Sequence, residues 1–181
     1  HWIDDVLMGC AFPEASQGLN IARQAALLGG LPVEVPASTV NRFCASGLQT
    51  IAQAADRIMA GNDEIIIAGG VESMSLVPMG GYAVHPNPEL VANYPDVYVN
   101  MGITAENVAE KYQISRSDMD AFALESHKRA LNAWEQGYFD EQIVPVPVTN
   151  KGIAASGEVQ EEHFKFRQDE GPRPDSSLEK L

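Results

Sequence analysis

The sequence has few cysteines, few basic residues and no long apolar run, and each shortage excludes a class of protein. Only two of its 181 residues are cysteine, Cys10 and Cys44, which is neither a disulfide framework nor the paired C-x-x-C spacing of a zinc site. The four histidines are scattered, without an H-x-x-x-H spacing. We therefore expect no metal site, and we expect a reducing compartment, the cytoplasm.

Basic residues are scarce relative to acidic ones. Twelve Lys and Arg stand against 25 Asp and Glu, so the formal net charge is −13. Phosphate neutralisation needs clustered basic residues, which argues against a nucleic-acid or anionic-membrane partner. No apolar run approaches the roughly 18 to 20 residues of a membrane span, and we expect no leader of the signal-peptide kind. We expect a soluble protein that meets an anionic ligand through a local basic contact or backbone N–H groups.

Both ends of the sequence are typical of cuts rather than of natural termini. His1 is not a natural start, and the last residues, "SSLEKL", stop inside what has the pattern of a beginning helix. The length is that of one to one and a half domains and is enough to bury a core.

Residues 1–75 alternate short apolar runs with helical patterns, and we take them as an N-terminal α/β core. Strand-like and helix-like segments follow one another at 4–12, 18–29, 35–40, after Cys44 and at 64–70. The last run, "EIIIAGG", is typical of a strand buried on both faces. Strand and helix in alternation predict a parallel sheet with covering helices.

The helix expected after Cys44 has an apolar stripe with the 3.6-residue period, and we expect this stripe to face the core. Its members are Leu48, Ile51, Ala52, Ala55, Ile58 and Met59. Gly61 follows the last periodic residue as a helix stop.

Residues 76–181 have a different composition and pattern, and they are predicted to form a second domain. A long excursion rich in Pro, Gly and Asn comes first; loops of this length are uncommon unless they are functional. Helical patterns return at 104–112 and at 115–137, the latter with a capping box of Ser115 and Asp118 and a stop at Gly137. "QIVPVPV" predicts an extended edge segment, because its prolines exclude a central strand. From Lys151 onward we expect a surface meander.

The two cysteines differ in their surroundings. Free cysteine is among the most buried residue types, and Cys10, in a strand-like run, is expected to be a core residue. Cys44 is followed by the small residues Ala45, Ser46 and Gly47, which let a ligand approach the backbone. It also stands where a helix begins, and the positive end of the helix dipole favours a thiolate.

A helix end alone does not activate a thiol. Its effect of about 1 kcal/mol lowers a thiol pKa by less than one, so a thiol with an ordinary pKa of about 8.5 stays mostly protonated at neutral pH. A general base is needed, yet the sequence gives no reason to place any of the four histidines next to Cys44. His1 is at the end, and we expect exposed polar positions for His85 in the excursion, His127 on a helix face and His163 in the polar tail. Cys44 is thus a candidate nucleophile without a visible partner.

Three stretches resemble the thiolases. "VNRFCASGLQTIAQAADRIMAGNDEIIIAGGVESMS" is similar to their nucleophile segment, and "MGITAENVAEKYQISRSDMDAFALESHKRA" to their CoA-binding loop domain. "RPDSSLEKL" resembles the segment that leads out of that domain. These stretches resemble most the degradative acetyl-CoA acyltransferases (3-ketoacyl-CoA thiolases) of fatty-acid β-oxidation. They resemble the acetoacetyl-CoA thiolases second.

The resemblance implies a role for three residues. Cys44 matches the nucleophile that attacks the 3-keto carbon of a 3-ketoacyl-CoA, and its backbone N–H matches an oxyanion-hole donor. Met101 matches a residue that lines the pantetheine pocket, and Arg173 matches the arginine that packs on the CoA adenine. Coenzyme A enters as a co-substrate, not as a permanently bound cofactor.

The resemblance also implies what the chain lacks. The family's Asn-Glu-Ala, Gly-His-Pro and Cys-x-Gly segments, which hold the activating histidine and a second cysteine, do not occur in residues 1–181. Asn100 stands where the biosynthetic acetoacetyl-CoA thiolases usually have histidine. We expect most of the N-terminal half of a five-layered α-β-α-β-α fold plus most of the loop domain, from a parent that forms homodimers or homotetramers. The isolated chain is expected to be inactive or nearly so.

Two other functions remain open at this point. One is an acetoacetyl-CoA thiolase (acetyl-CoA C-acetyltransferase). The other is a CoA-binding module without turnover. The sequence argues strongly against a ketoacyl synthase, which also uses a cysteine after a strand but lacks the loop domain with its "MGITAENVAEKY" element.

Overall fold

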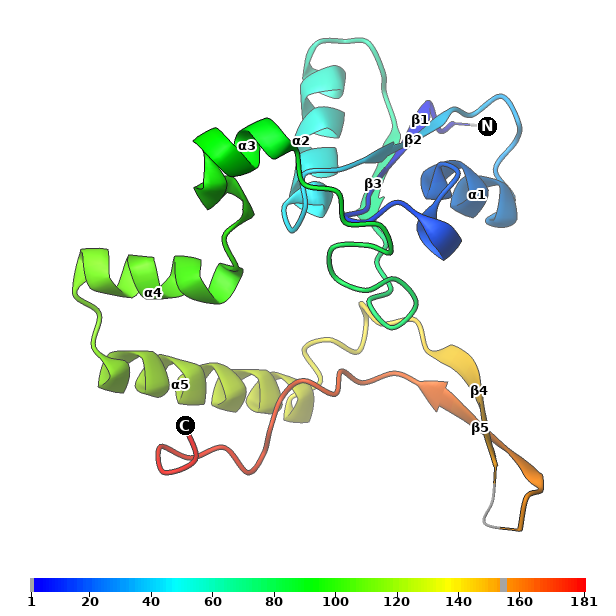
Figure 1. Cartoon of the computed structure of the whole chain (residues 1–181). Helices are drawn as coiled ribbons and strands as arrows, with labels where there is room; N and C mark the ends of the chain where they lie inside the picture. Colours follow the sequence, from blue (N-terminus) through cyan, green and yellow to red (C-terminus); the bar gives the residue numbers. More distant parts are fainter. Residues whose placement is uncertain (1, 154–155) are drawn as a thin grey trace. The chain divides into compact units, whose positions relative to one another are not determined.

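The computed structural model describes residues 2–153 and 156–181, in two compact units. The first unit spans residues 1–95 and the second 96–181, and each is described by itself (Figure 1). The boundary between the two compact units thus lies after residue 95, later in the chain than the change of composition at residue 75. The predicted domains, 1–75 and 76–181, concern the family's architecture and stay a prediction.

The first unit is built on a parallel sheet of three strands. The strands β1 (Asp5–Gly9), β2 (Ala37–Val40) and β3 (Ile66–Gly70) lie in the order β2-β1-β3. The helix α1 (Ile21–Leu28) connects the first two, preceded by the 3-10 turn η1 (Ala15–Gln17), and α2 (Ser46–Met59) connects β2 to β3. The predicted alternation of strands and helices is confirmed.

The two helices cover opposite faces of this sheet (Figure 1). Successive side chains of a strand point to opposite faces, so Val6 and Gly9 mark the two sides of β1. Val6 packs with Ala26 of α1, whereas Gly9 lies against Ser46 of α2. The chain steps from β1 to β2 on one side and then back past β1 to β3 on the other side. Right-handed connections that step in opposite directions place their helices on opposite faces of the sheet.

The expected core stripe of α2 is exposed, which corrects the sequence prediction. The helix instead buries its small and polar side, Ser46, Thr50 and Ala54, against the sheet. A Cβ built on Gly9 would lie 2.4 Å from the carbonyl carbon of Ser46, so strand and helix backbones approach too closely for large side chains. Leu48, 71% exposed, and the rest of the stripe therefore face away from β1.

The strand β3 also differs from its prediction. It forms an edge of the sheet and is only partly covered, with Ile67 42% exposed. Its apolar run predicted burial on both faces, but in residues 1–95 that environment belongs to β1, which has a strand on each side.

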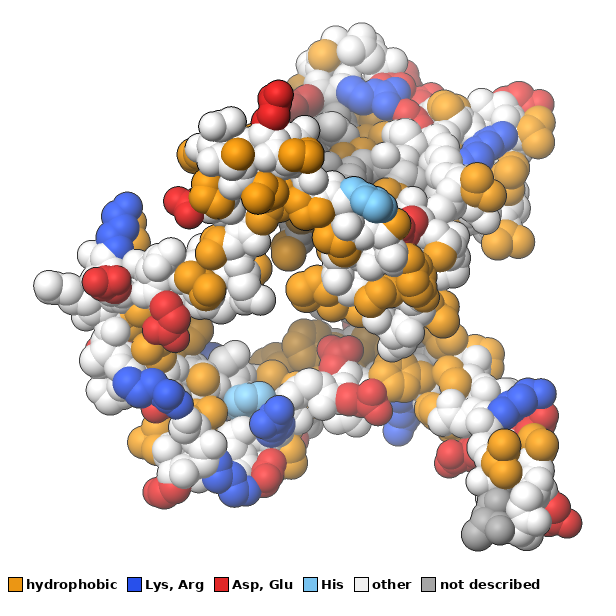
Figure 2. Space-filling model, viewed as in Figure 1, with side chains coloured by type: hydrophobic (Ala, Val, Ile, Leu, Met, Phe, Trp, Pro, Cys, Tyr) orange, Lys and Arg blue, Asp and Glu red, His pale blue; other side chains and the backbone are white. Residues whose placement is uncertain are grey.

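The Pro-rich excursion contains helical structure that its composition did not predict. Asn87 caps α3 (Pro88–Asn93), its side chain accepting from the N–H groups of Glu89 and Leu90, and Pro88 occupies the first turn. The 3-10 turn η2 (Pro95–Tyr98) follows. An Asn-Pro pair at a helix start is a recognisable signal. Figure 2 shows hydrophobic side chains exposed over α3 and the loop before it. Leu90 of α3, Tyr94 directly after it and Met79 of the loop are exposed apolar residues of this segment.

In its described residues, 96–153 and 156–181, the second unit contains two helices and a hairpin. The helices are α4 (Met101–Tyr112) and α5 (Arg116–Glu135), the latter capped by Ser115 and followed by Gly137 at φ 68°, as predicted. The segment with two prolines enters β4 (Val146–Ile153), which pairs antiparallel with β5 (Val159–Phe166). The described residues after Lys151 are mostly exposed, as expected, but they are not an irregular meander throughout, since β5 completes a hairpin there. Among the described residues, no helix is long and apolar enough to cross a membrane.

The close approach of β1 and α2 makes a stability prediction. Replacing Gly9 by Ala would force a methyl group into the backbone of Ser46 and Gly47, and we expect a loss of about 1 to 3 kcal/mol in the free energy of unfolding. Urea unfolding of the chain, followed by circular dichroism, measures it.

Gly47→Ala is the matched control. A Cβ at Gly47 meets no atom within 4 Å, so an alanine in this helix should be neutral or stabilising by roughly 0.5 to 1 kcal/mol. Equal unfolding midpoints for Gly9→Ala and the unaltered chain would contradict the proposed close packing.

Candidate active site

Cys44 lies at the carboxyl end of the parallel sheet, between a strand and a helix. The strand β2 ends at Val40, a turn of five residues follows, and α2 begins at Ser46. In open α/β sheets the carboxyl ends of the strands are where ligands bind. The Cys44 side chain is exposed there, as a nucleophile must be and a packing cysteine is not.

The turn around Cys44 is closed by the first residue of the helix. The buried hydroxyl of Ser46 accepts from the N–H of Arg42 at 2.8 Å and donates to the carbonyl oxygen of Phe43. Asn41 adds a second closure, since its side-chain oxygen accepts from the Phe43 N–H at 2.9 Å. These bonds explain why small and polar residues surround the cysteine: they form the turn and leave space above it.

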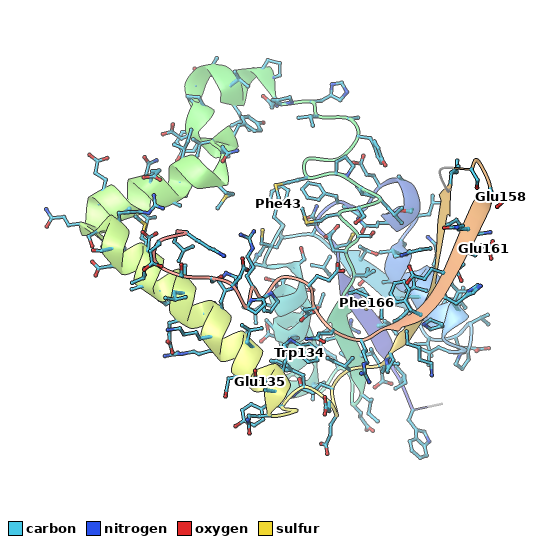
Figure 3. All side chains as sticks on the ribbon, turned by 90° about the horizontal axis from the view of Figure 1, so that it is seen from below. Phe43, Trp134, Glu135, Glu158, Glu161 and Phe166 are labelled. Atoms are coloured by element: carbon cyan, nitrogen blue, oxygen red, sulfur yellow. The ribbon has the colours of Figure 1, made fainter. Side chains whose placement is uncertain are left out.

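Phe43, directly before the cysteine, has a left-handed backbone. Its φ of 46° is rare for a residue with a side chain and costs of order 1 kcal/mol or more. The hydrogen bonds of Ser46 and Asn41 to its backbone hold it there. Its ring, which extends from the turn before α2 (Figure 3), lies 6.2 Å from the ring of Phe12, measured between centroids.

Cys10 is the buried cysteine that the sequence predicts. It is 1% exposed, and its thiol lies 3.8 Å from a carboxylate oxygen of Glu72. Burial, reinforced by the negative charge of Glu72, raises the pKa of the Cys10 thiol. Glu72 also accepts from the Ala11 N–H at 2.6 Å and from the Gln17 amide at 2.7 Å. This cluster, which the sequence did not indicate, fixes the end of β1 next to the turn.

The histidines do not supply a partner for Cys44. His85 and His163 are exposed, as expected, whereas His127 is half-buried on α5, which corrects its predicted exposed position. His1 lies outside the described residues. Within residues 2–153 and 156–181 no hydrogen bond reaches the Cys44 thiol. In the same ranges no group of three or more His, Cys, Asp or Glu side chains is arranged to hold a metal ion.

The two candidate CoA residues lie in the second unit and are exposed. Met101 is the first residue of α4 and is 69% exposed. Asn100, directly before it, caps that helix, its side-chain oxygen accepting from the Gly102 N–H at 2.7 Å. Arg173 lies in the segment after β5, and its N–H donates to Nδ1 of His127 at 3.0 Å. Their roles toward a ligand stay predictions, as does that of Cys44.

A hollow of about 560 Å³ in the second unit includes none of the predicted residues. Trp134 and Glu135, at the last turn of α5 (Figure 3), line it together with Asp140, Ile143 and Arg167. The Trp134 ring meets Phe139 edge to face, 5.3 Å between centroids. One cation and two carboxylates around a tryptophan specify no ligand class.

Comparison with known proteins places the whole chain in one family. The profile of the thiolase N-terminal domain matches residues 1–181. The chain is 52% identical over 179 residues to a 3-ketoacyl-CoA thiolase of Bacillus subtilis (strain 168), covering 99% of the chain and 46% of that protein. It is 42% identical over 197 residues to a beta-ketoadipyl-CoA thiolase of Pseudomonas aeruginosa, again covering 99% of the chain and 46% of the relative.

A solved structure agrees in fold. The crystal structure of the Bacillus anthracis acetyl-CoA acetyltransferase superimposes with a TM-score of 0.79 at 37% identity, covering 99% of the chain and 46% of that protein. The chain thus spans about half the length of the curated relatives it matches.

The contrast between the two thiols predicts selective alkylation. A raised pKa lowers the thiolate fraction at any given pH, and burial blocks access, so Cys10 should resist iodoacetamide at about pH 8. Cys44 is exposed and should react. Intact-mass spectrometry of the folded chain should therefore find one adduct.

Two serine variants locate that adduct. Cys10→Ser should keep it and Cys44→Ser should lose it, while both thiols of the unaltered chain should react in denaturant. Similar rates at both cysteines in the folded chain would show that the predicted difference in access does not exist.

Proposed function

The chain belongs to the thiolase family, and from this premise we propose that the whole protein is a 3-ketoacyl-CoA thiolase of fatty-acid β-oxidation. It would split a 3-ketoacyl-CoA with CoA into acetyl-CoA and a shortened acyl-CoA. The observation that carries the proposal is the exposed Cys44 thiol on a fixed strand-to-helix turn. The 52% identity to a 3-ketoacyl-CoA thiolase supports the substrate class.

Cys44 is the proposed nucleophile. Its thiolate sulfur bonds to the 3-keto carbon, the bond between that carbon and the α-carbon breaks, and the electron pair passes to the α-carbon, which takes a proton as acetyl-CoA leaves. The acyl group stays on the sulfur as a thioester. The thiolate of a second CoA then attacks this carbonyl and releases Cys44. Two acyl transfers thus replace one difficult cleavage.

Part of the activation comes from the turn itself. The start of α2 carries a partial positive charge, which stabilises a nearby anion by about 0.3 to 1 kcal/mol. The backbone N–H of Cys44 is the proposed donor to the oxyanion that forms when sulfur attacks the carbonyl. The base that removes the thiol proton is proposed to lie outside these 181 residues, so the isolated chain should turn over substrate barely or not at all.

CoA is the proposed co-substrate, held through the second unit. Met101 would line the pantetheine arm, and Arg173 would pack on the adenine. Both side chains are exposed and available. With a net charge of −13 the chain is a poor general anion binder, which makes a local basic residue such as Arg173 more important for a phosphorylated ligand.

The exposed stripe of α2 supports a larger assembly. Leu48, Ile51, Ile58 and Met59 are between 42% and 76% exposed, although apolar side chains at this spacing usually pack against another layer. We propose that the whole protein covers this stripe and forms homodimers or homotetramers, with no nucleic-acid or membrane partner, in the cytoplasm.

An acetoacetyl-CoA thiolase is the second candidate. The TM-score of 0.79 with an acetyl-CoA acetyltransferase favours it. Asn100, at the position where biosynthetic acetoacetyl-CoA thiolases usually have histidine, favours the degradative type. Rates of the whole protein on acetoacetyl-CoA and on a longer 3-ketoacyl-CoA distinguish the two.

Acyl transfer to Cys44 is testable in this chain. The thiolate is the nucleophilic form of a cysteine, so raising the pH to about 9 favours reaction without a base. Incubation with acetyl-CoA should then add one acetyl group to Cys44, more slowly at pH 7, and release free CoA. Peptide mass spectrometry identifies the modified residue.

Cys44→Ser and a short thioester are the controls. The variant should stay unmodified, and S-acetyl-N-acetylcysteamine, which lacks the nucleotide, should react more slowly than acetyl-CoA. Equal acetylation of Cys10, or no adduct while iodoacetamide still alkylates Cys44, would refute the proposed role. Sustained thiolysis of acetoacetyl-CoA by the chain alone would refute its proposed inactivity.

A further inference from the structure

Arg173 is held to α5 by a single side chain from far along the sequence. Its N–H donates to Nδ1 of His127 at 3.0 Å, across 46 positions of the chain. Because Nδ1 accepts this bond, the imidazole proton must be on Nε2. A half-buried histidine in the middle of a helix thus fixes the backbone of the residue that the proposed function assigns to the adenine.

The neighbouring prolines make this bond unusually important for the segment. Pro172 and Pro174 have no N–H, so the N–H of Arg173 is the only backbone donor of residues 172–174. Proline also fixes its own φ and restricts the residue before it to extended conformations. The segment is therefore stiff, and the hydrogen bond from the Arg173 N–H holds its backbone on the helix.

A second contact fixes the other side of the same residue. The carbonyl oxygen of Arg173 accepts from the N–H of Ser176 at 3.4 Å. Pro172 and Ser176 are half-buried, whereas the Arg173 side chain is exposed. The backbone of Arg173 is held at both its donor and its acceptor while its guanidinium remains accessible to a ligand.

The segment also has a tether at the start of α5. The guanidinium of Arg116 donates to the carbonyl oxygen of Leu181. Arg116 and His127 are eleven positions apart, about three helical turns, so both lie on one face of α5. Two side chains on that face therefore hold residues 173–181 along the helix.

We propose that His127 is a positioning residue for CoA, which sets the backbone of Arg173 so that its side chain meets the nucleotide. This proposal rests on the proposed function. His127 itself touches no ligand, and its contribution comes through the acceptor at Nδ1. A preset arginine avoids the entropic cost of ordering its loop when CoA binds.

Three substitutions separate this role from simple packing. His127→Asn keeps an oxygen acceptor near the position of Nδ1, His127→Gln moves it toward the position of Nε2, and His127→Ala removes it. By calorimetry with CoA, the Kd should rise about three- to tenfold in His127→Ala and His127→Gln, the scale of one hydrogen bond, and should be largely restored in His127→Asn.

Two further measurements connect the effect to Arg173. Hydrogen exchange of the Arg173 amide in the free chain should be faster in His127→Ala than in His127→Asn. In an Arg173→Ala background, His127→Ala should weaken CoA binding no further, because its effect passes through Arg173. His163→Ala, which removes an exposed histidine of the hairpin, is the matched control and should leave the Kd unchanged.

The outcomes distinguish the two proposals. If the unaltered, folded chain gives no heat with CoA, the CoA part of the proposed function fails, and this inference with it. If the unaltered chain binds CoA and His127→Ala binds it equally well, only the inference fails. A loss in His127→Ala that Asn does not restore, or that persists in the Arg173→Ala background, would also overturn it.

Discussion

The contact between Gly9 of β1 and Ser46 of α2 is the constraint on which the first unit depends. A hydrogen at the Cα of Gly9 lets the two backbones approach to a distance that any side chain would block. Ser46 and Thr50 can then bond to the turn and to the end of β3, Thr50 through the Gly69 carbonyl at 2.9 Å. The start of the helix, and with it Cys44, is thereby fixed to the carboxyl end of the sheet.

The turn that holds Cys44 stores strain and offsets it with hydrogen bonds. Phe43 has an unfavourable φ of 46°, yet its N–H and its carbonyl oxygen are both bonded, to Asn41 and Ser46. A nucleophile has to be exposed and still well placed, and a short, internally bonded turn meets both needs without covering the thiol. Cys10, directly after the neighbouring strand β1, has the opposite environment: it is buried, and this burial, followed by the negative charge of Glu72, raises the pKa of its thiol.

In the second unit the candidate residue Arg173 must also be exposed and well placed, and here a stiff backbone segment around it meets this need. Arg173 is long and exposed, and a flexible loop beneath it would make binding entropically costly. Two prolines and the His127 bond reduce that freedom before any ligand arrives. The two units thus place their candidate residues by different means, a strained turn in one and a pinned extended segment in the other.

Local patterns in the sequence determined the alternation of strands and helices, the Ser115 cap, the Gly61 and Gly137 stops, the burial of Cys10 and the candidate nucleophile. Each of these features depends on residues within a few positions along the chain. The family was recognised from the sequence of longer motifs. Tertiary structure alone decided which side of α2 is covered, that β3 is an edge strand and that His127 meets Arg173. Apolar periodicity indicates that one face of a helix tends to be buried. The close approach of the backbones, here at Gly9, decides which face packs against the sheet.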